Sequence, residues 1–151
     1  MSNILILGDG AREQTIAEKL KKENTHIFFY AKNDFNEIKD LCEKQNINLV
    51  IPSSERYLCN GITDYLQKHI QNIKIFGPNK YQAKIEGSKH FSKLVMRKLK
   101  IPTANFIYFK DKDNIVKYIY EFYKHLQEDD IVIKYSGLAK GKGVYLPNNC
   151  T

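Results

Sequence analysis

Short apolar runs alternate with amphipathic stretches over the first two thirds of the chain. The runs are rich in Ile, Val, Leu and Phe, which suits buried strands, and they cover residues 3–7, 26–30, 47–51 and 73–76. Between them, apolar residues recur at the spacing of a helix, after Gly10 and then over residues 34–45, from about 60, and over 88–99. This βαβαβαβ order predicts an α/β fold with a doubly wound parallel sheet and right-handed crossovers.

The pattern changes at Ile101-Pro102, where a helix is expected to end because proline disfavours helical conformation in the residue before it. Beyond this point we predict a strand over 105–109, a helix over 114–126 and two short strands around a glycine-rich loop. The chain is therefore expected to form a Rossmann-like domain over residues 1–101 and the beginning of a second domain over 102–151.

The turn after the first predicted strand, GDGAREQ, is a candidate anion site. A helix that begins at such a turn presents free N–H groups and a partial positive charge at the carboxyl edge of the sheet. Glu55, in the loop after the third strand, falls at the same edge. The alternative is that the glycines only sharpen the turn, because GxG without a third glycine is a weak fingerprint, and that Glu55 is an ordinary loop glutamate.

The stretch DIVIKYSGLAKGKGVYL carries the most specific chemistry. Its glycines let backbone N–H groups approach a ligand closely, and its lysines add positive charge, so the loop suits a polyphosphate. The alternative is a solvated hairpin tip in a lysine-rich protein.

Composition excludes several classes of protein. The 151 residues are 42% hydrophobic, and no segment approaches the ~18 apolar residues of a membrane span, so a membrane is not an expected partner. The net charge is +7, but the lysines are scattered, so a nucleic acid is not an expected partner either. We see no secretory signal, and the three cysteines form no CxxC pairing, which favours reduced thiols and a cytoplasmic location. The four histidines show no metal-ligand spacing.

Read as a whole, VIKYSGLAKGKGV resembles the strand and flexible loop of the ATP-grasp ligases, in the form found in phosphoribosylamine–glycine ligases. Three more stretches resemble that family: GDGAREQ is similar to its GxGGREH turn, PSSERYL to its GPExPL corner, and IFGPNKYQAKIEGSKHFSKLVMRKLKIPTANF to its FGP, A-x-x-E-x-SK-x-F and IPT elements. The resemblance implies a Rossmann-like domain followed by the start of an ATP-grasp subdomain.

The resemblance also implies site residues. Those expected to bind ATP are Lys89, Lys134, Gly137, Lys140, Gly141, Lys142 and Gly143. Those expected to contact the substrate are Gly8, Gly10, Arg12, Glu13 and Glu55. Lys134 lies among Ile131, Val132 and Ile133, which favours an inward orientation. Without the surrounding string, Lys89 would be interpreted as one more solvated helix lysine.

The chain also departs from the family. Ala11 replaces a glycine, Gln14 a histidine, Tyr57 a proline, and Ser53-Ser54 a Gly-Pro pair. The second strand leads through residues 31–33 directly into a helix, without the family's APGN-type phosphate loop.

In the family reaction, ATP phosphorylates the carboxylate of glycine, and the amine of phosphoribosylamine attacks the acyl phosphate to give glycinamide ribonucleotide. The resemblance ends just after the glycine-rich loop, so the second half of the nucleotide clamp and the magnesium ligands are not expected in this chain. Glu128, Asp129 and Asp130 are interpreted as a solvated turn.

Three hypotheses follow: an N-terminal portion of a phosphoribosylamine–glycine ligase that lacks full activity alone, a non-catalytic nucleotide-binding or interaction module derived from that fold, and another small ATP-grasp or dinucleotide-binding protein. The first implies ATP and magnesium as cofactors, glycine and phosphoribosylamine as ligands, and a chain that supplies the rest of the fold.

Overall fold

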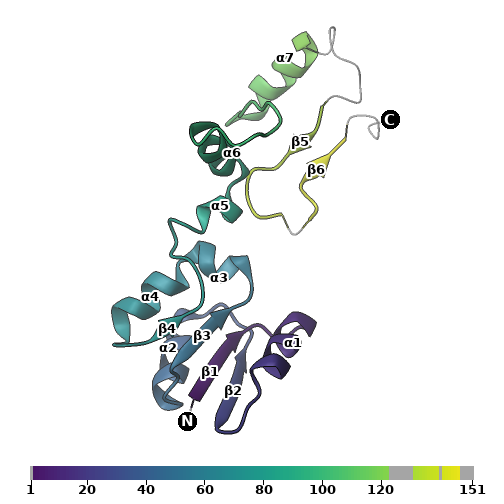
Figure 1. The fold of residues 1–151 in the computed structure, drawn as a ribbon. Helices are drawn as coiled ribbons and strands as arrows, with labels where there is room; N and C mark the ends of the chain where they lie inside the picture. Colours follow the sequence, from purple (N-terminus) through teal and green to yellow (C-terminus); the bar gives the residue numbers. More distant parts are fainter. Residues whose placement is uncertain (1, 123–130, 140, 147–151) are drawn as a thin grey trace. The chain divides into compact units, whose positions relative to one another are not determined.

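The structure, a computed structural model, describes residues 2–122, 131–139 and 141–146 (Figure 1). It divides into two compact units, Met1–Gly87 and Ser88–Thr151, and each is described by itself. None of the helices in the described ranges combines the length and apolar character that crossing a membrane requires.

The first unit is built on a four-stranded parallel sheet. Its strands lie in the order β2-β1-β3-β4, and their bounds are β1 Ser2–Leu7, β2 Thr25–Tyr30, β3 Leu49–Pro52 and β4 Lys74–Ile75. The helices that connect and follow them are α1 Ala11–Leu20, α2 Phe35–Lys44, α3 Glu55–Asn60, α4 Ile62–His69 and α5 Lys84–Gly87 (Figure 1). The predicted α/β fold with a parallel, Rossmann-like sheet is confirmed.

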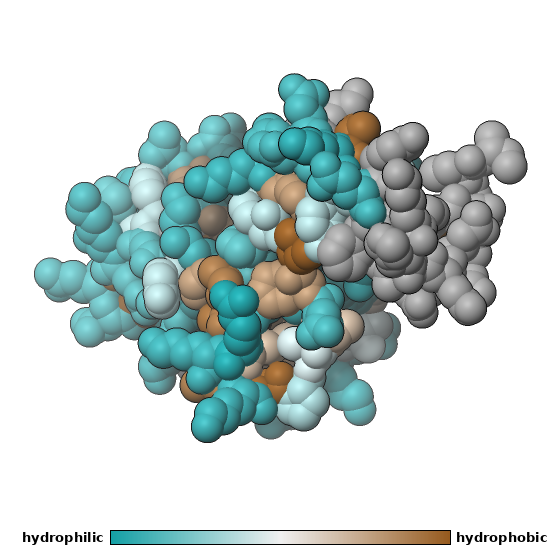
Figure 2. Space-filling model, turned by 90° about the horizontal axis from the view of Figure 1, so that it is seen from above, coloured by the Kyte–Doolittle hydropathy of each residue, from teal (hydrophilic) through white to brown (hydrophobic). Residues whose placement is uncertain are grey.

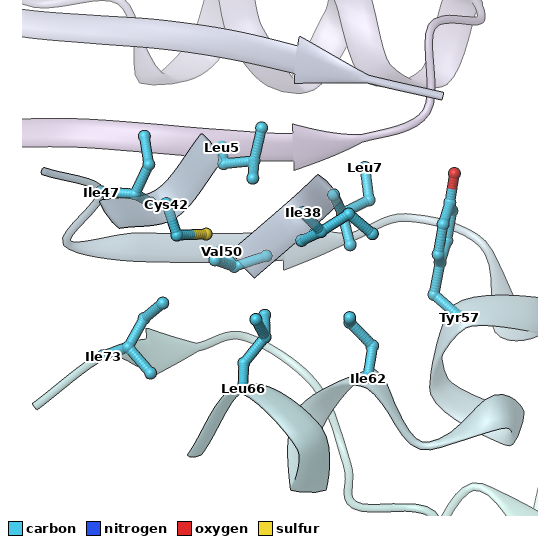
Figure 3. Packing of buried hydrophobic residues seen from close by; sticks show 10 residues of the cluster. All are labelled: Leu5, Leu7, Ile38, Cys42, Ile47, Val50, Tyr57, Ile62, Leu66 and Ile73. Atoms are coloured by element: carbon cyan, nitrogen blue, oxygen red, sulfur yellow. The ribbon is translucent and has the colours of Figure 1, made fainter. Parts of the chain in front are cut away.

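The central strand β1 is buried on both faces because helices cover the sheet from both sides. Leu5 and Leu7 face the larger cluster, which Figure 3 shows between the sheet and the helices α2, α3 and α4. Ile4 and Ile6 face the other side, where Ile51 and the apolar residues of α1 pack against them. The alternation follows from the two-residue period of a strand, and burial on both faces explains why residues 4–7 are apolar without interruption.

Three turns from helix to strand share one backbone conformation. Asn24, Asn46 and Asn72 precede β2, β3 and β4, and their φ angles are 64°, 49° and 60°. After glycine, asparagine is among the residues that adopt this left-handed region most readily, because its short amide can hydrogen-bond locally. The same turn chemistry therefore returns the chain to the sheet three times.

The second unit contains α6 Lys89–Lys98, α7 Lys112–Phe122, and the antiparallel strands β5 Ile133–Lys134 and β6 Val144–Tyr145. Among the residues described in this unit only Gly143 is buried, and large apolar side chains such as Val132 and Tyr145 are exposed. On the face of the molecule in Figure 2, brown hydrophobic surface lies between teal hydrophilic side chains.

Several local predictions for this unit were wrong. No strand forms over 105–109, because β5 and β6 pair only with each other in the described residues and leave that segment without a neighbouring strand. Lys134 is exposed and not inward. The helix expected over 114–126 is found as α7, and its predicted end, like Glu128, Asp129 and Asp130, lies outside the described residues.

The helix α6 groups with the second unit, whereas the sequence suggested a boundary near residue 101. The reason is a set of hydrogen bonds at its start: the backbone N–H of Lys89 donates to the Ser136 carbonyl at 2.8 Å, and the backbone N–H of His90 donates to the Ser136 hydroxyl at 3.1 Å. Ser88 caps the helix by accepting a hydrogen bond from the Phe91 N–H.

Candidate functional site

The turn between β1 and α1 is closely packed around Gly8. Its φ of +130° is a conformation that favours glycine, and its N–H donates to the Tyr30 carbonyl at 2.8 Å. A Cβ atom at this position would lie 2.8 Å from the Glu13 Cγ and 2.9 Å from the Ser53 Oγ. Gly8 therefore serves the tight turn, which was the structural alternative for the glycines of this loop.

Glu13 lies in the first turn of α1 and holds the loop that precedes it. Its side chain is only 8% exposed, and its Oε2 accepts a hydrogen bond from the Gly10 N–H at 2.7 Å. Its Oε1 accepts from the Ser53 hydroxyl. The Ser53 hydrogen bond, helped by the Gly10 N–H and by the Arg12 charge, holds the pKa of Glu13 below its ordinary value, although burial opposes the shift.

Arg12 contacts the same serine through the main chain. Its Nη1 donates to the Ser53 carbonyl oxygen at 2.6 Å, while the rest of the side chain is exposed. Ser53 follows β3, so this contact joins the turn after β1 to the end of the neighbouring strand. Arg12, Glu13 and Ser53 therefore meet at the carboxyl edge of the sheet, where ligands bind in folds of this type.

A pocket of about 340 Å³ opens beside these residues. Arg12 and Ser53 line it together with Glu55, Cys59 and Glu86. It thus combines one guanidinium with two carboxylates. Burial, and then the charges of Glu55 and Glu86, raises the pKa of the Cys59 thiol, so this cysteine stays protonated at neutral pH.

Of the residues predicted to contact substrate, the pocket therefore brings together Arg12 and Glu55. Gly8, Gly10 and Glu13 lie in the adjoining turn and are absent from the pocket wall. The sequence did not single out Ser53, Cys59 or Glu86. Ser53 could have been found, since it is the first residue after a buried strand and its hydroxyl stands where the family pattern has glycine.

In the second unit, Lys89 meets the glycine-rich hairpin directly. Its Nζ donates to the Gly137 carbonyl oxygen at 3.1 Å, and its backbone N–H donates to Ser136. The first turn of α6 and the start of the hairpin loop are thus held together by side-chain and main-chain bonds. Two of the residues predicted to bind ATP, which lie 48 positions apart, are in contact.

The hairpin loop itself is tight. Lys142 N–H donates to the Ala139 carbonyl at 2.9 Å, and Tyr135 N–H donates to the Gly143 carbonyl at 2.8 Å. Gly141 has a φ of +77°, and a Cβ there would meet nothing within 4 Å, so its backbone is accessible. A Cβ at Gly143 would lie 2.6 Å from the Ala139 Cβ. Lys134 and Lys142 are exposed, and Lys140 lies outside the described residues.

The ring of His90 stacks on Tyr108, with centroids 3.8 Å apart. Its Nδ1 is buried and has no hydrogen-bond partner in the described part of the chain. Within those residues, no three His, Cys, Asp or Glu side chains are grouped so that they could hold a metal ion. The described residues therefore do not fit a magnesium site.

Comparisons with known proteins match both units. Residues 28–86 match the family model described as "Phosphoribosylglycinamide synthetase, N domain", and residues 87–151 match "Phosphoribosylglycinamide synthetase, ATP-grasp (A) domain". The junction between the two matches falls beside the division between the two compact units after Gly87.

Curated relatives agree with these matches. The bifunctional purine biosynthetic protein PUR2,5 of Pichia angusta is 37% identical over 97% of this chain and 20% of its own length. The phosphoribosylamine–glycine ligase of Fusobacterium nucleatum subsp. nucleatum is 37% identical over 97% of this chain and 37% of its own length. The bifunctional protein ADE5,7 of Saccharomyces cerevisiae is 33% identical over 99% of this chain and 21% of its own length.

The parallel α/β unit thus corresponds to an N domain of this class, and the unit with the glycine-rich hairpin held on Lys89 corresponds to part of an ATP-grasp domain. More narrowly, the chain belongs to the phosphoribosylglycinamide synthetase family, and it covers the N-terminal portion of that family's proteins. It spans 20% to 37% of the length of the relatives described above.

Proposed function

We propose that the chain provides the N-terminal part of a phosphoribosylamine–glycine ligase and lacks full activity by itself. Its second unit would bind the phosphates of ATP, and its first unit would bind a substrate. The observation that carries this proposal is the 3.1 Å contact between the Lys89 ammonium group and the Gly137 carbonyl oxygen, which brings a cation of α6 onto the hairpin loop.

The residues of the hairpin suit a polyphosphate. The accessible backbone at Gly141 allows N–H groups to approach an anion, and Lys142 and Lys134 are exposed cations near the two strands. Ammonium groups neutralise phosphate charge as mobile point charges, so an exposed position in the absence of ligand is compatible with this role. The proposed ATP contacts are Lys89, Lys134, Gly137, Lys140, Gly141, Lys142 and Gly143.

The pocket of the first unit suits a small ligand that carries both signs of charge. Arg12 can bind an anionic group, and Glu55 can accept hydrogen bonds from an amine. Phosphoribosylamine has one group of each kind, and so has glycine. The proposed substrate site comprises Arg12 and Glu55, with Gly8, Gly10 and Glu13 in the turn beside them.

The chemistry of ligation would need residues beyond those described here. Phosphoryl transfer depends on positioning and on neutralisation of the developing charge, usually by magnesium, and no metal cluster occurs in the described residues. We propose that the magnesium ligands and the second half of the nucleotide site come from the remainder of the ATP-grasp fold. The exposed apolar side chains of β5 and β6, among them Val144 and Tyr145, are compatible with such an addition.

A calorimetric titration with magnesium ATP tests the nucleotide site. We expect saturable binding by the unmodified chain and loss of binding in a Lys89→Ala, Lys134→Ala double variant. A Lys19→Ala, Lys98→Ala double variant removes the same charge from exposed helix positions outside the site, and it should bind as the unmodified chain does.

If the unmodified chain fails to bind at millimolar ATP, a limit of about −4 kcal/mol, the nucleotide proposal is rejected. That outcome would favour the alternative function, a non-catalytic interaction module derived from the same fold. The feature that favours this alternative is the surface of the second unit, where Val132, Leu138 and Leu146 are exposed together with the apolar residues of β6.

A further inference from the structure

Ser53 contacts the turn after β1 with both its side chain and its main chain. Its hydroxyl lies within hydrogen-bond distance of the Glu13 carboxylate and 2.7 Å from the Leu7 carbonyl oxygen. A hydroxyl has one hydrogen to donate, and an ionised carboxylate is the stronger acceptor. Ser53 therefore donates to Glu13 whenever Glu13 is charged.

The carbonyl oxygen of the same residue holds Arg12. One N–H group of the guanidinium donates to it at 2.6 Å, and a guanidinium has five such groups in a fixed plane. Fixing one edge of that plane restricts the orientation of the others. Because Arg12 and Ser53 both line the 340 Å³ pocket, the restricted group lies where an anion could bind.

Glu13, by contrast, has both carboxylate oxygens engaged within the protein. They accept from the Gly10 N–H and from the Ser53 hydroxyl, and the residue is 8% exposed. Arg12, the residue before Glu13, lines the pocket, but Glu13 does not. Releasing Glu13 to a ligand would break its hydrogen bonds to the Gly10 N–H and the Ser53 hydroxyl, which opposes such a role.

We infer that Ser53 is a positioning residue of the substrate site, which keeps Glu13 as a support of the turn and orients Arg12 toward the anionic group of the ligand. This inference rests on the proposed substrate site and refines it, since it assigns the ligand contact to Arg12 and removes it from Glu13. The serine side chain carries the part of this role that acts through Glu13, at a position where the related sequence pattern has glycine, whereas the contact to Arg12 comes from the main-chain carbonyl.

The test uses the full chain and ribose 5-phosphate, a stable anionic sugar phosphate, as the probe. Its affinity is measured by calorimetry at neutral pH, and the Glu13 carboxyl is titrated separately by carbon NMR from neutral to acidic pH. Ser53→Ala keeps the carbonyl that holds Arg12 but removes the hydroxyl that holds Glu13. It should therefore raise the pKa of Glu13 and, by loosening the turn that carries Arg12, weaken binding by up to about tenfold. Thr15→Ala is the matched control, because its hydroxyl bonds only the Ala11 carbonyl within α1, and it should change neither quantity.

A second pair of variants distinguishes the role of Arg12 from that of its neighbour Glu13. Arg12→Gln should abolish probe binding, whereas Glu13→Gln should keep it within a few-fold at neutral pH. Equal losses in these two variants would overturn the inference, because they would make Glu13 a ligand contact. The inference also fails if Ser53→Ala binds as the unmodified chain does, or if it loses affinity while the pKa of Glu13 stays unchanged.

Failure of the proposed substrate site gives a different result, in which the unmodified chain does not bind ribose 5-phosphate at all. The positioning role is then decided by NMR alone. A raised Glu13 pKa and a shifted Gly10 amide signal in Ser53→Ala would support it, and unchanged values would overturn it.

Discussion

The phenolic hydroxyl of Tyr57 donates a hydrogen bond to the carbonyl oxygen of Ala31 at 2.8 Å, and so joins α3 to the residue that follows β2. The ring is 2% exposed and belongs to the larger core cluster (Figure 3). The short connection between β2 and α2 is therefore held by a side chain of α3. A tyrosine at this position supplies a hydrogen bond that the proline of the related pattern could not.

Replacing Tyr57 with phenylalanine should lower the free energy of unfolding of the first unit by about 1–2 kcal/mol. The ring would still fill its place in the core, but the Ala31 carbonyl would lose its partner in a partly buried position. Urea unfolding followed by circular dichroism measures the change. Tyr65→Phe is the control, because its hydroxyl bonds the exposed Asn36 side chain, and it should cost less. Equal losses in the two variants would contradict this assignment.

Glu13 should make the stability of the first unit sensitive to acid. Because its pKa is lowered in the folded protein, its contribution is fully present above the ordinary value of 4.5 and is lost as the pH falls through the lowered value. The unmodified chain should therefore be more stable than Glu13→Gln near neutral pH, and the difference should shrink in acid.

Denaturant unfolding at a series of pH values measures that difference. Glu18→Gln, at an exposed position of the same helix, should be no less stable than the unmodified chain at any pH. A difference between the unmodified chain and Glu13→Gln that stays constant down to strongly acidic pH would show that Glu13 acts only through its shape.

Asn46 should tolerate glycine but not alanine. Its φ of 49° costs a residue with a Cβ about 1–2 kcal/mol, a penalty that asparagine partly escapes and glycine avoids. Asn46→Ala should thus destabilise the first unit by about 1 kcal/mol, whereas Asn46→Gly should be close to neutral. Asn33→Ala, at an exposed position without a positive φ, serves as the control in the same unfolding experiments. The argument fails if alanine and glycine at position 46 have the same effect.

Amide hydrogen exchange should divide the chain sharply. The N–H groups of β1 and β3 lie in a sheet covered on both faces, so they should be strongly protected. In the hairpin, the Tyr135 N–H donates to the Gly143 carbonyl, and this amide should exchange orders of magnitude faster, because an isolated two-stranded hairpin is only marginally stable. Mass spectrometry of exchanged peptides measures both. Comparable protection would mean that the hairpin has a partner in solution.

The strands and helices of the first unit could be predicted because their signals are local. The uninterrupted apolar run at residues 4–7 indicates a strand buried on both faces. The family itself was also recognisable from local strings such as the glycine-rich loop. These features need no knowledge of distant residues.

The site depended on distant residues, and it was therefore only partly predictable. Glu13 and Ser53 are 40 positions apart, and nothing near Glu13 indicates that a carboxylate, normally a surface group, would be buried against a hydroxyl. The segment 105–109 has the composition of a strand, but pairing requires a neighbour that the described residues do not offer. Lys134 likewise lies in an apolar run, yet burial needs a covering layer as well as apolar neighbours.

The parallel sheet has a consequence for the time course of synthesis. Ile4 in the central strand pairs with Leu49, about 45 residues later, and at roughly 5–20 residues per second the ribosome needs about 2–9 s to produce that partner. No two of these strands can pair as a local hairpin, because each pair is parallel and joined through a helix. The central strand β1 is thus made before both of its neighbours and remains without one of them for seconds, which exposes residues 4–7 to other nascent chains and to chaperones.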